Sequence, residues 1–192
     1  MQQTTKTRIA ALGAGFALAA GALVSVAPAA QAASVKSDFS CDTEALGAQV
    51  LSVTTKVKLP AKVKKGKTVG SKKVTMVVVL PQGLTDALRF IGVTELSGSA
   101  TGVKAKVGKT SFAVKGVKFT DVKVPASGPM KITAKGTTAA FKIKKPGSYT
   151  ISIPKKFDFS STTQNGDPLT NEAPCSLVKG QPTKLGTLKV TK

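Results

Sequence analysis

The chain has 192 residues, 29 lysines and arginines against nine acidic residues, and a formal net charge of +20. It contains no histidine, so Ser-His-Asp triads, Cys-His pairs, HExxH metal motifs and histidine-bearing zinc sites are excluded. After Arg8, Arg89 is the only arginine. Arginine commonly forms two parallel hydrogen bonds to a base or a phosphate, whereas lysine is a hydrated point charge, so we expect no specific recognition of nucleic acid.

Residues 1–32 have the pattern of a secretory signal peptide. A positively charged start precedes an apolar run over 9–26, and Ala30-Gln31-Ala32 fits the small-x-small cleavage rule. We expect this leader to be removed, which leaves one domain of residues 33–192 with no transmembrane anchor. The protein would then be secreted, extracellular or associated with the cell envelope. A retained anchor is the less favoured alternative, because the run is rich in alanine and glycine.

Period-two alternation of apolar and polar residues dominates the rest of the chain and predicts β-strands. In 50–59 (VLSVTTKVKL), Leu51, Val53 and Val57 share one face, whereas 73–80 (KVTMVVVL) is apolar on both faces, as expected for a central strand.

Between these two strands the chain is unusually rich in lysine. Residues 55–74 carry eight lysines and no acidic side chain, and the pattern predicts two strand ends joined by a turn around Gly66. The lysines of this turn are candidates for an anion contact: Lys62, Lys64, Lys65, Lys67 and Lys72.

Residues 82–92 (QGLTDALRFIG) interrupt the alternation. Leu84, Leu88 and Ile91 stand at i, i+4 and i+7, and Gly92 is a suitable stop, so a short amphipathic helix is predicted. It would cover one end or edge of the fold; alternatively, these three apolar side chains contact a lipid or a protein partner.

Further strands are expected after the helix, at 101–107, 112–119, 121–124, 130–135, 140–147, 149–153 and 185–190. The polar segment 160–174 (SSTTQNGDPLTNEAP) is interpreted as an exposed loop. Strands at this spacing, separated by glycine and proline, are typical of an all-β, immunoglobulin-like antiparallel β-sandwich of about seven to nine strands, here with one short helix and one disulfide.

The two cysteines, Cys41 and Cys175, are most simply one structural disulfide in an exported chain. The alternative is a pair of free thiols with a redox or nucleophilic role. It has neither a CxxC pair nor a histidine to activate a thiolate.

Other motifs match known chemistry poorly. The two S-x-x-K matches, at 152–155 and 176–179, are expected by chance, and 102–110 has the wrong spacing for a P-loop. The acidic and amide side chains that could bind calcium miss the EF-hand spacing; they are Asp158, Asn165, Asp167, Asn171 and Glu172. We therefore expect no catalytic residue, no metal site and no cofactor, and a protein that is not an enzyme.

Several phrases of the sequence together resemble a family of exported actinobacterial domains of unknown function. They are "FSC", "TELSGSATG", "VPASGPMKITAKG", "KPGSYTISI" and "PCSL…LGTLKV", and the similarity spans residues 38–192. The resemblance implies an immunoglobulin-like β-sandwich, a disulfide between the early and late cysteines, and no established activity. The chain departs from the family in having lysine where such domains are rich in threonine and serine.

Net charge and predicted export together favour a non-enzymatic module that associates loosely with anionic cell-envelope polymers, such as teichoic-acid-like phosphates or acidic polysaccharides. A second hypothesis is a carrier or partner-binding module that uses the apolar helix and an adjoining pocket. A secreted hydrolase with paired carboxylates is a third. A surface whose lysines serve solubility alone competes with the first.

Overall fold

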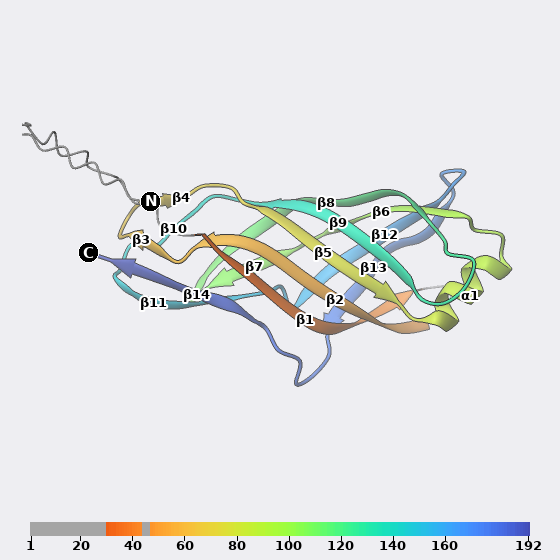
Figure 1. The fold of residues 1–192 in the computed structure, drawn as a ribbon, viewed down its shortest axis with the longest axis horizontal. Coiled ribbons are helices and arrows are strands. Elements are labelled where there is room, and N and C mark those ends of the chain that lie inside the picture. The colour runs from red at the N-terminus through yellow and green to blue at the C-terminus, as the bar shows by residue number, and fades with distance from the viewer. Residues whose placement is uncertain (1–29, 44–46) are drawn as a thin grey trace, which may run out of the picture.

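A computed structural model describes residues 30–43 and 47–192 (Figure 1). The fold is all-β with one short helix, as predicted. The helix is α1 (Gln82–Phe90). The strands are β1 (Ala30–Thr43), β2 (Gly47–Pro60), β3 (Lys62–Lys64), β4 (Thr68–Val69), β5 (Lys73–Leu80), β6 (Glu95–Thr101), β7 (Lys104–Val107), β8 (Thr110–Lys123), β9 (Met130–Thr138), β10 (Phe141–Lys142), β11 (Gly147–Ser152), β12 (Lys156–Thr163), β13 (Pro168–Leu177) and β14 (Lys184–Thr191).

The predicted signal peptide falls almost entirely on residues 1–29, which lie outside the described part of the chain. Residues 30–32 begin β1, where Ala30 pairs with Pro60 of β2. Among the described residues, no helix has the length and apolar character needed to cross a membrane.

The prediction of an immunoglobulin-like sandwich is wrong, because the strands close into a barrel. Eight antiparallel strands pair in the ring β8-β6-β12-β13-β1-β2-β5-β9, and β9 pairs back to β8. In a sandwich the outer strands of each sheet would keep free edges, whereas the β8–β9 pairing removes them here. Inward-facing residues alternate along a strand in both architectures, so the predicted inward face of β2 is confirmed even though the architecture was wrong.

The barrel closes where β8 bends. Lys115 pairs with Thr137 of β9 and Lys118 with Lys135, so two residues of β8 oppose the single residue Gly136. This is a β-bulge, a feature that bends a strand and increases its twist. Gly116, inside the bulge, has a φ of 60°, a conformation that glycine adopts without strain.

Because of this bend, β8 pairs with two different strands along its length, first β7 and then β6. Its first half pairs with β7, from Thr110 opposite Val107, and its second half pairs with β6, up to Lys123 opposite Glu95. From β7 the sheet continues through β11 and β14 to β3. At the end of the molecule remote from α1, the core therefore lies between β2 and β5 on one side and β7, β11 and β14 on the other.

The polar segment 160–174 is not a loop, contrary to expectation. β12 and β13 extend through it and pair with each other, and β12 also pairs with β6. Asn165-Gly166 forms the turn: the Gly166 N–H donates to Thr163 O at 3.0 Å and the Thr163 N–H to Asp167 O at 2.9 Å. Because β12 is bonded to β13 on one side and to β6 on the other, its polar sequence can form a strand. The Asn-Gly pair is a hairpin signal that sequence reasoning missed.

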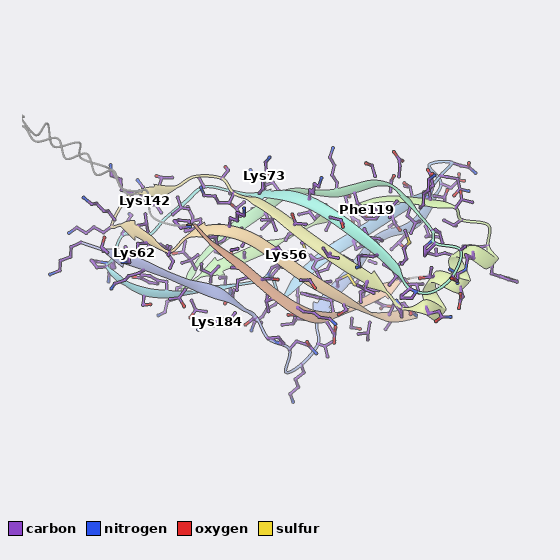
Figure 2. All side chains as sticks on the ribbon, viewed as in Figure 1. Lys56, Lys62, Lys73, Phe119, Lys142 and Lys184 are labelled. Atoms are coloured by element: carbon purple, nitrogen blue, oxygen red, sulfur yellow. A yellow bond between two sulfur atoms is a disulfide. The ribbon has the colours of Figure 1, made fainter. Side chains whose placement is uncertain are left out.

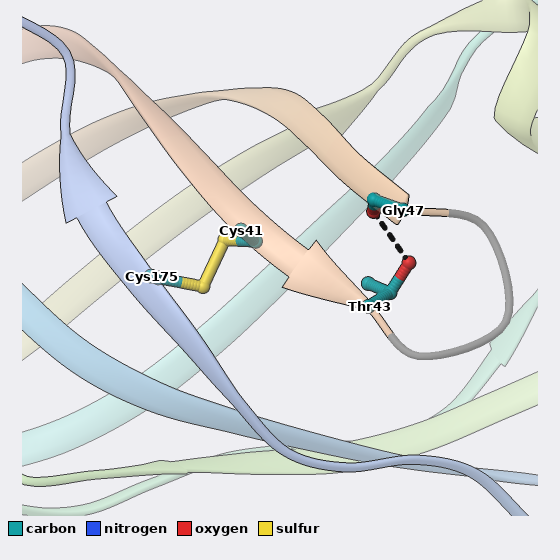
Figure 3. The surroundings of a disulfide bond; sticks show 4 residues. All are labelled: Cys41, Thr43, Gly47 and Cys175. Carbon is teal, nitrogen blue, oxygen red and sulfur yellow. Dashed lines mark hydrogen bonds between the residues drawn. A yellow bond between two sulfur atoms is a disulfide. The ribbon is translucent and has the colours of Figure 1, made fainter.

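The predicted disulfide is confirmed. Cys41 of β1 and Cys175 of β13 are directly paired residues on neighbouring strands of the barrel (Figure 3). Both are buried. The bridge therefore lies inside the barrel wall and joins two strands that are 134 residues apart in the sequence.

The helix α1 lies over one end of the barrel (Figure 1) and is attached through Thr85. This side chain is fully buried, and its Oγ1 accepts a hydrogen bond from the Met130 N–H of β9 at 3.1 Å and donates one to Pro81 O at 3.2 Å. One hydroxyl thus joins the start of the helix to the barrel.

We expect Thr85→Val to lower the free energy of unfolding by about 1–2 kcal/mol, because the isosteric valine leaves the buried Met130 N–H without this acceptor. Urea denaturation measures the change. Thr85→Ser keeps the hydroxyl and serves as the control. If the valine variant were as stable as the serine variant, the hydroxyl would have no role in fastening the helix.

Candidate functional site

Exposed lysines gather at the end of the molecule remote from α1. We call this group the lysine end. Figure 2 labels two of its members, Lys62 and Lys142, at the end where Figure 1 marks the C-terminus. The group consists of Lys62, Lys64, Lys65, Lys67, Lys142, Lys144, Lys145, Lys189 and Lys192, all of them exposed.

Backbone pairing brings these lysines together from three separate parts of the chain. β3 runs parallel to β14, with Lys62 paired to Lys189. β4 pairs with β10, where Lys142 lies opposite Thr68. The cluster is thus built by the sheet and does not rest on one flexible segment.

The predicted turn around Gly66 is the centre of the cluster. Its Lys67 N–H donates to Lys64 O at 3.1 Å, and Gly66 has a φ of 72°. Two further N–H groups fasten the turn to its neighbours: that of Lys65 donates to Thr191 O at 2.8 Å and that of Gly66 to Ile143 O at 2.9 Å. The turn is therefore held between the C-terminal strand and the segment that carries Lys142 and Lys144.

Acidic residues are segregated from this end. In the described residues they lie on α1, on strands of the barrel or in the β12–β13 turn: Asp38, Asp42, Asp86, Glu95, Asp121, Asp158, Asp167 and Glu172. None lies on β3, β4, β10, β11 or β14. The ion pair that the structure shows between described residues, Arg89 with Asp86, is on α1.

This arrangement carries an electrostatic cost. Lys62 and Lys189 are paired on neighbouring strands, which lie about 4.8 Å apart, so their side chains leave the same face of the sheet side by side. Like charges placed opposite each other destabilise a sheet, and among the described residues no acidic side chain at this end offsets them. A bound polyanion would remove the repulsion.

Of the lysines predicted to contact an anion, Lys62, Lys64, Lys65 and Lys67 belong to the lysine end. Lys72 differs: it is half-buried, and its backbone is bonded to Thr138, with its N–H donating to Oγ1 at 3.0 Å and its carbonyl accepting from the Thr138 N–H at 2.9 Å.

Sequence reasoning missed the lysines contributed by β10, β14 and the segments after them. One signal was available, because residues 122–157 and 173–192 contain no acidic residue, like the turn itself. What joins these segments is strand pairing between distant parts of the chain, which the sequence pattern does not specify.

A second feature is a cavity inside the barrel, at the α1 end. Its volume is about 90 Å³, and all eight strands of the ring and α1 contribute to its lining. Small side chains, among them Ala100, Ala134 and Ser161, leave this space. A core that leaves such a volume unfilled by its own side chains is less stable by about 2 kcal/mol than one that fills it.

Of the three apolar side chains predicted to make the contacts of the helix, two face the interior of the barrel and one is exposed on the surface. Leu84 and Leu88 line the cavity, and Leu88 is only 2% exposed. Ile91 lies just beyond the helix and is 60% exposed, next to Phe90, which is 92% exposed. Sequence reasoning overlooked Phe90, which stands on the outer face of α1.

The described residues contain no group of three or more acidic or cysteine side chains placed to hold a metal ion.

Aromatic rings pair within the fold: Phe39 with Phe157 at a centroid distance of 5.1 Å, and Phe112 with Phe141 at 4.6 Å.

Comparison with known protein families places the described barrel in a family. The model of the DUF6801 family, a family of unknown function, matches residues 38–186. No curated protein and no solved structure matches the chain significantly. The matched range contains most of the barrel, both cysteines and the lysine-rich turn, but stops before the lysines at the C-terminus.

Proposed function

Because the chain belongs to the DUF6801 family, whose function is unknown, we propose a function from its own charge distribution. The protein is an exported binding protein, not an enzyme, and it attaches to anionic polymers of the cell envelope through the lysine end.

The observation that supports this proposal most strongly is the absence of acidic side chains from the lysine end among the described residues. Nine exposed lysines meet at an end whose strands carry no acidic side chain, and three separate chain segments supply them. Lysines that served only solubility could equally well be interspersed with acidic residues, which would avoid their mutual repulsion. A concentrated positive end attracts a polyanion and steers its approach.

The chemistry of the lysine end favours a flexible polymer of phosphates or carboxylates over nucleic acid. Binding of single strands relies on exposed aromatic rings that stack on the bases. The tyrosine at the lysine end, Tyr149, is half-buried, and its hydroxyl donates to Lys145 O at 2.9 Å. Phe141, the phenylalanine nearest to these lysines in the sequence, is buried against Phe112. Lysine ammonium groups suit diffuse attraction to repeated charges, with little demand on geometry.

Two features support export as part of this proposal. Residues 1–32 have the pattern of a signal peptide. The Cys41–Cys175 disulfide is typical of proteins that fold in an oxidising compartment.

A test compares two variants with the same net charge on immobilised polyphosphate and polygalacturonate. The first variant replaces lysines of the lysine end by glutamine: Lys62, Lys64, Lys65, Lys67 and Lys142. The second replaces five exposed lysines elsewhere: Lys56, Lys73, Lys104, Lys131 and Lys156. We expect the first to lose on the order of tenfold or more in affinity and to elute at lower salt, because it lacks the concentrated contacts with the polymer.

The second variant should lose clearly less affinity than the first. An equal loss in both would show that binding depends on net charge alone, and would contradict a site at the lysine end. Absence of binding by the unmodified protein at low ionic strength would contradict the proposal as a whole. Thermal unfolding of both variants checks that they are folded.

A further inference from the structure

The end of the molecule that carries α1 differs in charge from the rest of the surface. We call it the α1 end; it consists of α1, the described segments that join the ring strands there, and the nearest five residues of each ring strand (Figure 1). Among the described residues, six of the eight acidic ones lie in it, together with three basic ones. The acidic residues are Asp42, Asp86, Glu95, Asp121, Asp167 and Glu172, and the basic residues are Arg89, Lys123 and Lys131. This end is therefore acidic on a strongly basic protein.

Basic neighbours balance only part of this negative charge. Asp86 forms an ion pair with Arg89, and Glu95 lies opposite Lys123 in the β6–β8 ladder. The other four acidic residues of the α1 end are exposed, and among the described residues one lysine, Lys131, remains at this end to offset them. A net negative charge is thus presented to a partner.

The β12–β13 turn places one of these carboxylates beside the end of the helix. Gln164 in the turn accepts from the Thr94 N–H at 3.1 Å and donates from Nε2 to Gly92 O at 3.3 Å. The carbonyl of Asp167 accepts from the Thr163 N–H at 2.9 Å, which closes the same turn. Asp167 is therefore held close to the segment that follows α1.

Exposed apolar side chains gather at the same end. Of the large apolar residues that the structure describes, Phe90, Ile91 and Val50 are exposed, with 92%, 60% and 55% of their surface open to solvent. All three lie in the α1 end, Phe90 and Ile91 where α1 ends and Val50 on β2. Single exposed apolar residues are common, but their concentration at one end marks an interaction site. Acidic residues around an aromatic side chain indicate a protein partner with a basic surface.

We propose that the α1 end of one copy of the protein binds the lysine end of a second copy. The two surfaces have opposite charge, because the lysine end presents nine exposed lysines and its strands carry no acidic side chain. Phe90 suits this partner, since an aromatic ring packs against the aliphatic part of a lysine and attracts its ammonium group. The two surfaces lie at opposite ends of the molecule (Figures 1 and 2), so the contact repeats head to tail and forms an open row.

Charge disfavours the other occupants of the α1 end. A symmetric dimer through two α1 ends would place acidic residues against acidic residues, and an anionic membrane would be repelled. The positive net charge of the whole protein opposes self-association as well. Lysines remote from the contact have little influence, however, because charges are screened beyond a Debye length of about 8 Å at physiological ionic strength.

Sedimentation equilibrium of the intact, disulfide-bonded protein in about 0.15 M salt tests this contact. We expect a weak interaction with a dissociation constant on the order of 10–100 µM, as is typical of small, transient interfaces. Because a head-to-tail contact does not close, the average mass should rise steadily with protein concentration and pass that of a dimer. A protein that stays monomeric even at millimolar concentration, or a mass that levels off at a dimer, would overturn the proposal.

Removing the two surfaces separately locates the contact. The α1-end variant combines Phe90→Ser, Asp42→Asn and Asp167→Asn, and we expect it to bind itself at least about tenfold more weakly. Its control carries Asp38→Asn and Asp158→Asn, which make the same change in net charge at the two described acidic residues outside this end. An equal loss in the control would contradict a contact at the α1 end.

The lysine-end variant carries the five glutamine substitutions already described for polymer binding. Its lower net charge reduces the general repulsion between copies, so net charge alone predicts stronger self-association. We expect self-association that is at least about tenfold weaker, because the acidic residues lose their partners. Self-association as strong as that of the unmodified protein would overturn the assignment of the lysine end as the second surface.

A mixture of the two variants gives the sharpest test. Each variant keeps one intact end, so the α1 end of the lysine-end variant can bind the lysine end of the α1-end variant. We expect a 1:1 complex that grows no further, formed from two proteins that are each monomeric alone. A mixture that stays monomeric would contradict a head-to-tail contact. Binding of a monomeric unmodified protein to phosphatidylcholine vesicles, lost on Phe90→Ser, would assign the apolar group to a lipid surface and would also overturn the proposal.

Self-association does not depend on polymer binding, and the two can fail separately. The α1-end variant should bind immobilised polyphosphate as tightly as the unmodified protein does, because its lysine end is unchanged. Soluble polyphosphate should compete for the lysine end and dissociate the rows. If rows form but polyphosphate leaves them intact, polymer binding at the lysine end is contradicted and self-association is supported. If polymer binds but no rows form, self-association is contradicted and polymer binding is supported.

Discussion

Replacing both cysteines, as in Cys41→Ala with Cys175→Ala, should lower the free energy of unfolding by about 2–5 kcal/mol. The bridge joins residues 134 apart, so it restricts the unfolded chain strongly; the loop-entropy model gives about 5 kcal/mol as an upper value for such a loop. The position of the disulfide in the barrel adds to this effect. β1 and β13 pair only from Phe39 opposite Leu177 to Cys41 opposite Cys175, so the disulfide strengthens a short seam, that is, a short ladder between two neighbouring strands of the ring.

Urea denaturation of the oxidised protein measures this change. The matched control is Ser40→Ala with Ser176→Ala, because these two residues are paired on the same strands, one position before Cys41 and one after Cys175. We expect the control to stay close to the unmodified protein. If the cysteine variant were as stable as the serine control, the bridge would not hold this seam together.

Gly136→Val should destabilise the protein by about 3 kcal/mol, the upper part of the range for overpacked sites. A methyl group on the Cα of Gly136 would lie 2.7 Å from Val117 Cγ2 and 3.1 Å from Lys115 O. Both partners belong to β8, and the second is backbone, so the strands would have to separate. That separation would open the seam at which the barrel closes.

The control for this prediction is Gly70→Val. Gly70 has nothing within 4 Å of the position that a side chain would occupy, and the substitution should change stability by less than about 1 kcal/mol. Hydrogen exchange of the amides of β8 and β9 gives a second measurement, because opening of the seam exposes them. Equal stability of the two variants would contradict the close approach of β9 to β8, and with it the closed barrel.

The two shortest ladders of the ring help to explain why the architecture was predicted wrongly. At β1–β13 the ladder is short, and at β8–β9 it is interrupted by the bulge at Gly116. Alternating residues mark which side chains face a core, but the inward faces of a barrel and a sandwich have the same period. Only the pairing of β9 with β8 distinguishes the two.

The candidate sites show a similar division. The turn around Gly66 and four of its lysines could be predicted, because alternation stops at Pro60 and resumes at Lys73. Lys142 and Lys189 could not be assigned to the same site, because their proximity depends on the β4–β10 and β3–β14 pairings. For the helix, the sequence pattern placed Leu88 on the apolar face. It did not show whether that face contacts the barrel interior or a partner.

By itself, the sequence determined the properties that depend on residue type and local period. Absence of histidine excludes whole classes of catalysis, alternation makes the chain all-β, and a pattern of i, i+4 and i+7 predicts the one described helix. Tertiary structure alone decided the closure of the barrel, the cavity within it and the gathering of lysines at its far end. These properties depend on contacts between residues far apart in the chain, whose free energies local sequence patterns do not report.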